Sequence, residues 1–415
     1  MNKTDIVVIG GGAAGMLAAR AASVSGANVT LLERNEKLGR KIYITGKGRC
    51  NVTNACSVHD VLNNIPGNSR FVTGAINRFP PSAVMELFEQ LGVKLKVERG
   101  NRVFPVSDRS ADIIDALVRE LRRCKVTVVR DRACEIVCRD GAVAAVRGEA
   151  DTYPCTCVIL ATGGVSYPLT GSTGDGYDMA AKVGHTIVEP RGSLVPLEVL
   201  EPCCAEMQGL SLRNVTLKIK NSKKKIVYQE LGEMLFTHFG ISGPLVLSAS
   251  ACMRDYEADQ YTAHIDLKPG LDEQKLDARL VREIVERSNQ DIQNILGAVL
   301  PRLMIQTILD RSDVPGSTKG HDISKTQRRR LVEQMKNLVL HISGPRPVQE
   351  AIVTAGGVKV HEIDPKTMSS KLVSGLYFAG EVIDVDAYTG GFNLQIAWST
   401  GNTAGTCAAE ACKVI

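Results

Sequence analysis

Short apolar runs and one glycine-rich turn alternate at the start of the chain. Residues 5–9 (DIVVI) and 27–32 (ANVTLL) are almost entirely apolar. Such runs are typical of strands that are buried on both faces of a parallel sheet. The alanine-rich stretch 16–25 between them has helical character, and Gly26 is a natural end for that helix. The pattern therefore predicts a β–α–β unit.

Further elements follow this unit before the character of the chain changes. Residues 80–92 and 108–123 are predicted as helices, and Ser107 or Asp108 is expected to cap the second one. The segments ACEIVCRD and AVAAVRG flank Gly141 and predict a β-hairpin. The apolar run at 157–161 predicts another buried strand.

The hydrophobic pattern changes near Arg191. Polar and apolar residues alternate in stretches of 191–235, and residues 272–342 are mostly amphipathic helix. Buried-strand character returns at 351–357 and 376–381, before a final predicted helix over 391–412.

This order of elements predicts a domain that is interrupted by a second one. Residues 1–190 and 346–415 would form the two segments of the first domain. Residues 191–345 would form the inserted domain, first β-rich and then helical.

Three glycines lie between the first predicted strand and helix in the order G-x-G-x-x-G, at Gly10, Gly12 and Gly15. The first permits a tight turn, the second lets a pyrophosphate approach the backbone, and the third lets helix and strand pack closely. The helix N-terminus then favours bound phosphates. Glu33 ends the second strand, 18 residues after Gly15, where an acid accepts hydrogen bonds from ribose hydroxyls. This pattern predicts a dinucleotide with a free ribose diol and leaves NAD and FAD open.

Later segments favour FAD. Residues 158–164 (VILATGG) are similar to the strand that closes the FAD domain in many flavoproteins, and residues 374–381 (SGLYFAGE) to the strand that carries an acid to the flavin ribitol. Residues 390–395 (GGFNLQ) then open the last predicted helix. A helix N-terminus beside the N1/C2=O edge of a flavin would stabilise the negative charge of the reduced ring.

Residues 42–54 (IYITGKGRCNVTN) combine glycine, asparagine and positive charge without a hydrophobic period. They do not form a nucleoside-triphosphate loop, because Lys41 stands where that motif needs Gly, and Gly48 replaces its Ser or Thr. We predict instead that residues 40–51 wrap around the FAD, from the adenosine ribose and phosphates toward the ring.

Four segments in order resemble the signature segments of the BaiN-like (bile-acid-inducible) flavoproteins: GRKIYITGKGRCNVTN, LATGGVSYPLTGSTGDGY, GEMLFTHFGISGP and AGEVIDVDAYTGGFNLQIAWSTG. The resemblance runs from residue 3 to about residue 410. It implies an α/β fold in which a Rossmann-like, two-dinucleotide-binding-type FAD domain, with a central parallel sheet and a β-hairpin or meander, is interrupted by a mixed β-barrel and helical domain. It also implies an oxidoreductase, since members are associated with ene-reductase reactions on steroid-type acids and with aminoacetone oxidation.

The motifs and this resemblance together imply a set of FAD contacts. The set comprises the phosphate turn, the 40–51 loop, the ends of later strands and the start of the last helix, with Ala133 as a backbone contact for adenine. Its members are Gly10, Gly12, Ala13, Ala14, Gly15, Glu33, Arg34, Arg40, Lys41, Gly46, Gly48, Arg49, Cys50, Asn51, Ala133, Thr162, Gly163, Gly164, Gly380, Glu381, Asn393 and Leu394.

Three side chains are candidates for a catalytic proton donor: Tyr167 in GGVSYP, His238 in a loop that leads into a helix, and Tyr388 in DAYTGG. In C=C reduction, hydride would leave flavin N5 for one carbon while a side-chain acid protonates the other. Each candidate could instead pack or cap local structure. Cys50 is expected to pack rather than react, because no Cys or His partner adjoins it in sequence.

Composition narrows the possible partners. The net charge of +5, from 50 basic and 45 acidic residues, and the 4% aromatic content argue against a nucleic-acid partner. The 12 cysteines lack the spacing of a metal site, so no metal is expected, and reduced thiols would fit the cytoplasm. No signal peptide is expected, because its cleavage would remove the first strand and its turn, and no membrane partner, because no apolar run could span a bilayer. The oligomeric state is not indicated.

The sequence therefore predicts an FAD-dependent oxidoreductase that reduces a C=C bond of a small organic, steroid-like or bile-acid-like substrate. No second G-x-G-x-x-G lies in a strand–helix setting, so NAD(P)H would dock transiently as the electron donor, or electrons would arrive otherwise. One alternative is an amine oxidase of the aminoacetone type that uses O₂. Another is a non-catalytic flavin redox sensor or an RNA-associated flavoprotein.

Overall fold

The computed structural model describes residues 4–253, 255–256 and 260–413. The chain divides into two compact units. Unit 1 comprises Met1–Ser193 and Val348–Ile415, and unit 2 comprises Leu194–Pro347.

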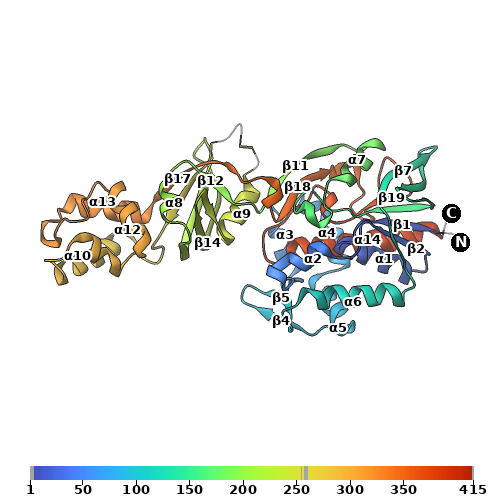
Figure 1. The fold of residues 1–415 in the computed structure, drawn as a ribbon, viewed down its shortest axis with the longest axis horizontal. Coiled ribbons are helices and arrows are strands. Elements are labelled where there is room, and N and C mark those ends of the chain that lie inside the picture. Colours follow the sequence, from blue (N-terminus) through green and yellow to red (C-terminus); the bar gives the residue numbers. More distant parts are fainter. Residues whose placement is uncertain (1–3, 254, 257–259, 414–415) are drawn as a thin grey trace. The chain divides into compact units, whose positions relative to one another are not determined.

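Unit 1 is built on a five-stranded parallel sheet in the order β19-β10-β1-β2-β6 (Figure 1). Every residue of the first four of these strands is buried, as their apolar sequences predict, whereas the edge strand β6 is largely exposed. The predicted β–α–β unit is confirmed, because helix α1 (Ala13–Val24) connects β1 to β2. The strands are β1 (Ile6–Ile9), β2 (Val29–Glu33), β6 (Thr127–Arg130), β10 (Cys157–Leu160) and β19 (Leu376–Phe378).

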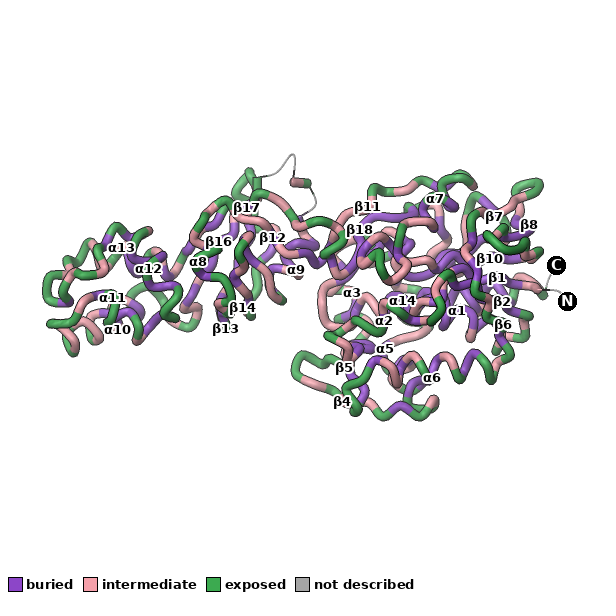
Figure 2. Tube along the Cα trace, in the orientation of Figure 1, coloured by how far each residue is buried: buried purple, intermediate pink, exposed green. Residues whose placement is uncertain are grey.

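Helix α14 (Phe392–Cys412) joins the two chain segments of unit 1 by packing along α1. The helices approach closely, because a Cβ atom on Gly401 or Gly405 would collide with a backbone carbonyl oxygen of α1. Trp398 is fully buried in the same helix and donates from Nε1 to the carbonyl oxygen of Val52 at 2.9 Å. Figure 2 shows buried residues concentrated in the central strands and these helices.

Smaller sheets and helices complete unit 1. The predicted hairpin is confirmed as β7 and β8, and the two predicted helices as α5 and α6. The elements are α2 (Arg40–Ile44), β3 (Thr53–Asn54), α3 (Val58–Asn63), α4 (Ser69–Arg78), α5 (Pro81–Gln90), β4 (Leu95–Glu98), β5 (Arg102–Pro105), α6 (Ser110–Arg123), β7 (Ala133–Arg139), β8 (Ala142–Gly148), β9 (Thr152–Pro154), α7 (Asp175–Lys182), β11 (Ile187–Ser193) and β18 (Val353–Val358).

The prediction that Ser107 or Asp108 caps α6 is wrong. The residue that precedes this helix is Arg109, and no side chain caps it. The Asp108 carboxylate instead accepts hydrogen bonds from Lys96 and Arg49, so it is engaged by two cations rather than by the free N–H groups of the helix.

Unit 2 combines a closed antiparallel barrel with a group of helices, as expected for the inserted domain. Val215, Leu217 and Ile219 alternate with more exposed residues along β13, so their side chains fill the interior of the barrel. The strands, in barrel order, are β12 (Leu197–Val199), β15 (Gly240–Ser242), β14 (Ile226–Thr237), β13 (Ser211–Lys220), β16 (Thr262–Asp266) and β17 (Leu338–Pro345). The helices are α8 (Cys203–Glu206), α9 (Pro244–Cys252), α10 (Glu273–Glu286), α11 (Ile292–Ile295), α12 (Arg302–Arg311) and α13 (Lys325–Lys336).

The close approach of α1 and α14 leads to a stability prediction. Gly401→Ala should lower the free energy of unfolding of unit 1 by ~1–3 kcal/mol, because the added Cβ forces the two helices apart. Urea unfolding with saturating FAD, followed by the fluorescence of Trp398, measures this change in unit 1, because the chain has only one tryptophan. Asn402→Ala is the control, since Asn402 is only half-buried. An equal loss in both variants would contradict the prediction.

Candidate functional site

The carboxyl ends of the parallel strands meet at one edge of the sheet, and several of the predicted FAD contacts lie there. Ligands of open α/β sheets bind outside these strand ends. The close approaches confirm that the segments lie together, since a Cβ on Gly10 would lie 2.6 Å from the carbonyl oxygen of Ala161, and one on Gly380 would lie 2.7 Å from the Cβ of Ala14. The predicted residues at these ends are Gly10 after β1, Glu33 at the end of β2, Ala133 beyond β6, Thr162, Gly163 and Gly164 after β10, and Gly380 and Glu381 after β19.

The glycine-rich turn between β1 and α1 is open where a phosphate would approach and closed where the helix packs. A Cβ on Gly12 would meet no atom within 4 Å, whereas one on Gly15 would collide with the carbonyl oxygen of Gly10. Ala13 and Ala14 begin α1, and no side chain caps this helix. Its first N–H groups and the positive end of its dipole are therefore available to a pyrophosphate.

Glu33 lies beside this turn with 9% of its surface exposed. Its Oε2 accepts a hydrogen bond from the backbone N–H of Gly11 at 2.7 Å, and its Oε1 accepts from the backbone N–H of Asn35 at 2.8 Å. Arg40 donates to the Asn35 side chain, while Arg34 donates to Thr173 and Asp175. The carboxylate is thus held rigidly next to the phosphate turn, where ribose hydroxyls would donate to it.

The loop after α2 has an unusual backbone. Gly46, Lys47 and Cys50 all have φ values near +58°, a left-handed conformation that is costly for the two residues with side chains. A Cβ on Gly48 would meet no atom within 4 Å, so the backbone is accessible there. The side chain of Cys50 is fully buried, and burial raises the pKa of its thiol to about 12. Cys50 is therefore a neutral thiol at physiological pH.

Arg49 anchors this loop with its side chain. Its guanidinium donates to Asp108 at 2.8 Å and to Glu98 at 3.3 Å, and it lies 4.1 Å from the centre of the Phe104 ring. The hydrogen bond from Arg49 lowers the pKa of Glu98, and hydrogen bonds from Lys96 and then Arg49 lower the pKa of Asp108. The side chain thus faces the small β3-β5-β4 sheet, and the loop offers its backbone to a ligand.

Two buried oxygen atoms test whether the site fits FAD. Asn51 Oδ1 and Thr162 Oγ1 have no hydrogen-bond partner among the described residues. A buried polar atom without a partner costs about 1–3 kcal/mol. FAD carries hydroxyl and N–H groups that could satisfy both atoms, and both belong to segments that were predicted to contact it. The residues of unit 1 therefore fit the cofactor.

Lys41 and Glu381 form an ion pair between the two chain segments of unit 1. Lys41 Nζ lies 2.6 Å and 2.8 Å from the two carboxylate oxygens, and each side chain retains about a fifth of its exposure. Glu381 also accepts from Ser166 Oγ at 3.1 Å and from the backbone N–H of Thr354 at 2.8 Å. The ion pair thus fixes the 40–51 loop to the end of β19.

The N-terminus of α14 is fixed by contacts on both sides. Gly391 precedes it with a φ of +99°, and a Cβ there would lie 2.5 Å from the backbone of Thr53. Asn393 Oδ1 accepts from the backbone N–H of Ala387 at 2.9 Å, and its Nδ2 donates to the carbonyl oxygen of the same residue at 2.7 Å. Leu394 follows in the first turn, half-buried. The helix end is thus rigidly positioned in unit 1.

The three candidate proton donors occupy different environments. Tyr167 is half-buried, has a φ of +53°, and burial raises the pKa of its hydroxyl. Tyr388 is half-buried and its backbone N–H donates to the carbonyl oxygen of Asn64 at 2.9 Å. His238 is exposed in unit 2 at the turn between β14 and β15. The loop that contains His238 leads into helix α9 through the short strand β15.

The described part of the chain offers no cluster of metal-ligating side chains. No group of three or more His, Cys, Asp or Glu side chains there could hold a metal ion. All 12 cysteines are free thiols. Within the same residues, no helix is both long and apolar enough to cross a membrane.

The family called HI0933-like protein Rossmann domain matches residues 4–407. The chain belongs to this family. The predicted resemblance to BaiN-like flavoproteins is confirmed, because this HI0933-like protein is 31% identical to the 3-dehydro-bile acid delta(4,6)-reductase of Clostridium scindens, over 99% of this chain and 100% of that relative. It is also 31% identical to the ribosomal RNA dihydrouridine synthase of Escherichia coli, over 96% of each chain.

Solved structures confirm the fold of this HI0933-like protein. The 3-ketosteroid-delta4-(5alpha)-dehydrogenase of Rhodococcus jostii RHA1 matches with a TM-score of 0.53 at 15% identity, over 98% of this chain and 97% of that one. A flavocytochrome c3 fumarate reductase matches with a TM-score of 0.52 at 17% identity, over 99% of this chain and 78% of that one. Together with the family, these findings show a Rossmann-type FAD domain and an FAD-dependent oxidoreductase.

Sequence reasoning missed two residues that hold the Glu381 carboxylate. Ser166 directly precedes the candidate Tyr167, and Thr354 lies in the predicted strand at 351–357. Ser166 donates to the carboxylate from its hydroxyl group and Thr354 from its backbone N–H, but nothing in the local sequence connects either residue to a carboxylate more than 25 residues away along the chain.

The position of Glu33 leads to a prediction about cofactor affinity. Glu33→Gln should weaken FAD binding by roughly 10–100-fold, because hydrogen bonds to a charged acceptor contribute about 1.5–3 kcal/mol. The flavin-to-protein ratio after gel filtration, and the Kd from flavin fluorescence, measure the change. Glu36→Gln is the matched control, since Glu36 is exposed three residues further on. Full flavin occupancy in the Glu33→Gln variant would show that the adenosine half is bound elsewhere.

Proposed function

We propose that this protein reduces a C=C bond that is conjugated with a carbonyl group, and that NADH or NADPH provides the electrons. The observation that carries the proposal is the pair of full-length relatives. One is a reductase of a 3-dehydro bile acid at its delta(4,6) bonds, and the other makes dihydrouridine in ribosomal RNA. Dihydrouridine differs from uridine by two hydrogens across one C=C bond of the ring. In both substrates that bond is conjugated with a carbonyl group, so one chemistry serves two substrate classes.

Unit 1 would hold the cofactor at its strand ends. The N–H groups at the start of α1 would bind the pyrophosphate, and the Glu33 carboxylate would accept from the adenosine ribose. The 40–51 loop and the Lys41–Glu381 pair would orient the ribitol and ring, next to the N-terminus of α14. When bound and reduced by NADH or NADPH, the flavin would supply hydride from its N5 atom.

Tyr167 is the proton donor that the surroundings favour most. It directly follows Ser166, whose hydroxyl binds Glu381, so it lies beside the proposed cofactor site. Its hydroxyl makes no hydrogen bond to any residue that the structure describes, and it is therefore available to a substrate. Because burial raises its pKa above the usual tyrosine value of about 10, the hydroxyl stays protonated at neutral pH. Tyr388 and His238 are the other candidates for this role.

Anaerobic spectroscopy tests the reaction and separates it from its rivals. NADH or NADPH should bleach the flavin, and either a uridine-containing RNA or an unsaturated 3-oxo steroid should then restore its colour with loss of the C=C bond. Oxidation of the flavin by O₂ after reduction by an aminoacetone-type amine would favour the oxidase instead. Bleaching that no C=C substrate reverses would favour a redox sensor.

Removal of the Tyr167 hydroxyl should impair proton transfer alone. Tyr167→Phe should lower kcat by about 10²–10⁴-fold, which is the usual contribution of a general acid, without changing flavin content. In the wild type, the rate should fall only above the ordinary tyrosine pKa, because the donor works while protonated and its pKa is raised. Tyr228→Phe is the control, since Tyr228 lies in unit 2, outside the proposed cofactor site, and its hydroxyl donates to Glu230 at 3.1 Å. Wild-type turnover in the Tyr167→Phe variant would assign the proton to another group.

A further inference from the structure

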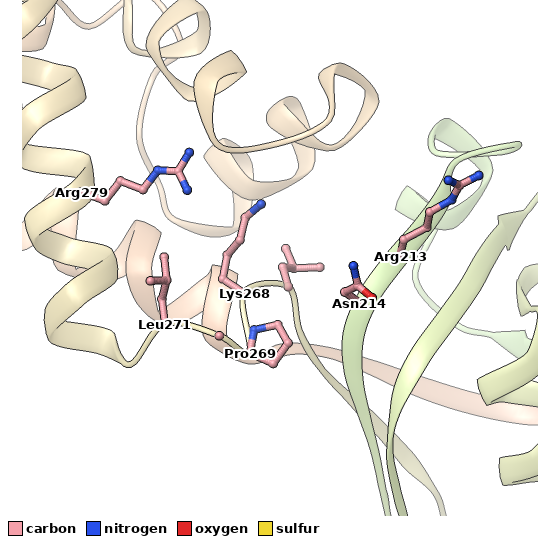
Figure 3. A pocket seen from close by; sticks show the side chains of 8 residues that line it. Arg213, Asn214, Lys268, Pro269, Leu271 and Arg279 are labelled. Carbon is pink, nitrogen blue, oxygen red and sulfur yellow. The ribbon is translucent and has the colours of Figure 1, made fainter. Parts of the chain in front are cut away.

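A pocket of about 380 Å³ opens between the barrel and the helical part of unit 2 (Figure 3). Its lining includes three cationic side chains, Arg213, Lys268 and Arg279, together with the amide of Asn214, and no carboxylate. Arg213 and Asn214 come from β13, Lys268 from the loop after β16, and Arg279 from α10. Three separate elements therefore contribute positive charge to one cavity.

A β-bulge places the barrel side of this pocket. The register of β13 against β14 shifts between Leu212 and Val215, at Arg213 and Asn214. Asn214 has a φ of +56°, a conformation that asparagine tolerates better than most residues. Bulges redirect side chains and are frequent next to functional sites. Both side chains are exposed, so a ligand in solution can reach them.

The other two cations lack a carboxylate partner in the described part of the chain. Arg279 donates only to the carbonyl oxygen of Ala298 at 3.3 Å, and Lys268 has no side-chain bond there. Burial and the nearby Arg279 lower the pKa of Lys268. The neighbouring carboxylate of Asp266 is already paired with Lys336 at 2.7 Å, and Lys336 also donates to the carbonyl oxygen of Lys268 at 3.0 Å. Lys336 thus stabilises the loop after β16, while the ammonium group of Lys268 in that loop remains available to an anion.

Further positive charge continues from the pocket along the outer face of β13. Lys218 and Lys220 follow Arg213 on this strand and form no ion pair among the described residues. Lys218 is opposite His264 on β16, and burial, together with the positive charge of both lysines, lowers the pKa of that histidine. The charge is therefore extended along one strand, which suits a polyanion better than a compact anion, although the net charge of the whole chain is small.

We propose that the pocket formed by Arg213, Asn214, Lys268 and Arg279 binds a phosphate of an RNA backbone, with the outer face of β13 contacting the phosphates that follow. This inference rests on the proposed C=C reduction and assigns its substrate to uracil in RNA. Arginine and lysine are the usual partners of backbone phosphates, and arginine can bind two phosphate oxygens at once. Such contacts hold and orient a nucleic acid without reading its sequence.

Salt-dependent binding tests the pocket without any turnover. The oxidised, FAD-loaded protein is titrated into a fluorescein-labelled single-stranded RNA of about 20 nucleotides, with uridines, at several salt concentrations. Arg213→Gln, Lys268→Gln and Arg279→Gln should each weaken binding by at least about tenfold and reduce the slope of log K against log salt by ~0.7. Arg329→Gln is the control, since Arg329 lies in the same unit, is 80% exposed in its side chain and does not line the pocket. Circular dichroism of each variant checks that unit 2 is folded.

The outcomes separate the pocket from the reaction. The proposal is overturned if the three variants bind RNA with the same affinity as the control. It is also overturned if the protein does not bind RNA at low salt. A raised KM for NADPH but not for NADH in the three variants, with RNA binding unchanged, also overturns it and assigns the pocket to the 2′-phosphate of the donor. Loss of RNA binding in the variants supports the pocket even if no C=C substrate reoxidises the flavin, in which case only the proposed reaction fails.

Discussion

The close packing of α1 against α14 is the constraint on which the rest of unit 1 depends. These helices belong to chain segments that are separated by the whole of unit 2. Because Gly401 and Gly405 carry no side chain, the backbone of α14 can lie against the carbonyl oxygens of Ala14 and Ala18. This close contact fixes the distance between α1 and α14. It therefore also fixes where the N-termini of both helices lie in unit 1. A bulkier residue at either position would displace the two helices, and with them the elements that we propose to hold the two ends of the cofactor.

Electrostatic interactions also hold the two chain segments of unit 1 together. The ion pair of Lys41 and Glu381 connects the same two chain segments and is only partly exposed, so it is screened less than a surface pair. Ser166 and Thr354 supply further donors to the carboxylate, and a charged group that is removed from water needs such partners. Arg49 fastens the other end of the loop to Glu98 and Asp108. The loop between these anchors can therefore hold a strained backbone that offers N–H groups to a ligand.

The two units offer potential ligands different kinds of polar group. Unit 1 carries exposed backbone N–H groups and the Glu33 carboxylate beside the glycine-rich turn, which suit the one cofactor of defined shape that we propose there. Unit 2 carries side-chain cations spread along one strand and into one pocket, which suit a ligand with repeated charge. Average composition conceals this arrangement, since acidic residues elsewhere offset the cations and leave a net charge of only +5.

Local sequence was sufficient for the elements whose signal is local. The apolar run of β1, the three glycines before α1 and the acid that ends β2 follow one another within 33 residues, so their spacing alone predicts a dinucleotide site. Apolar runs likewise predict the buried strands, and the alternation of polar and apolar residues predicts the β-rich part of unit 2. Only the tertiary structure decided which residues from distant segments meet: Lys41 with Glu381, Thr354 with the same carboxylate, and Arg213 with Arg279 around one pocket. The physical reason is that hydrophobic periodicity specifies which face of an element is buried, whereas side-chain pairing depends on chain crossings that no short stretch of sequence encodes.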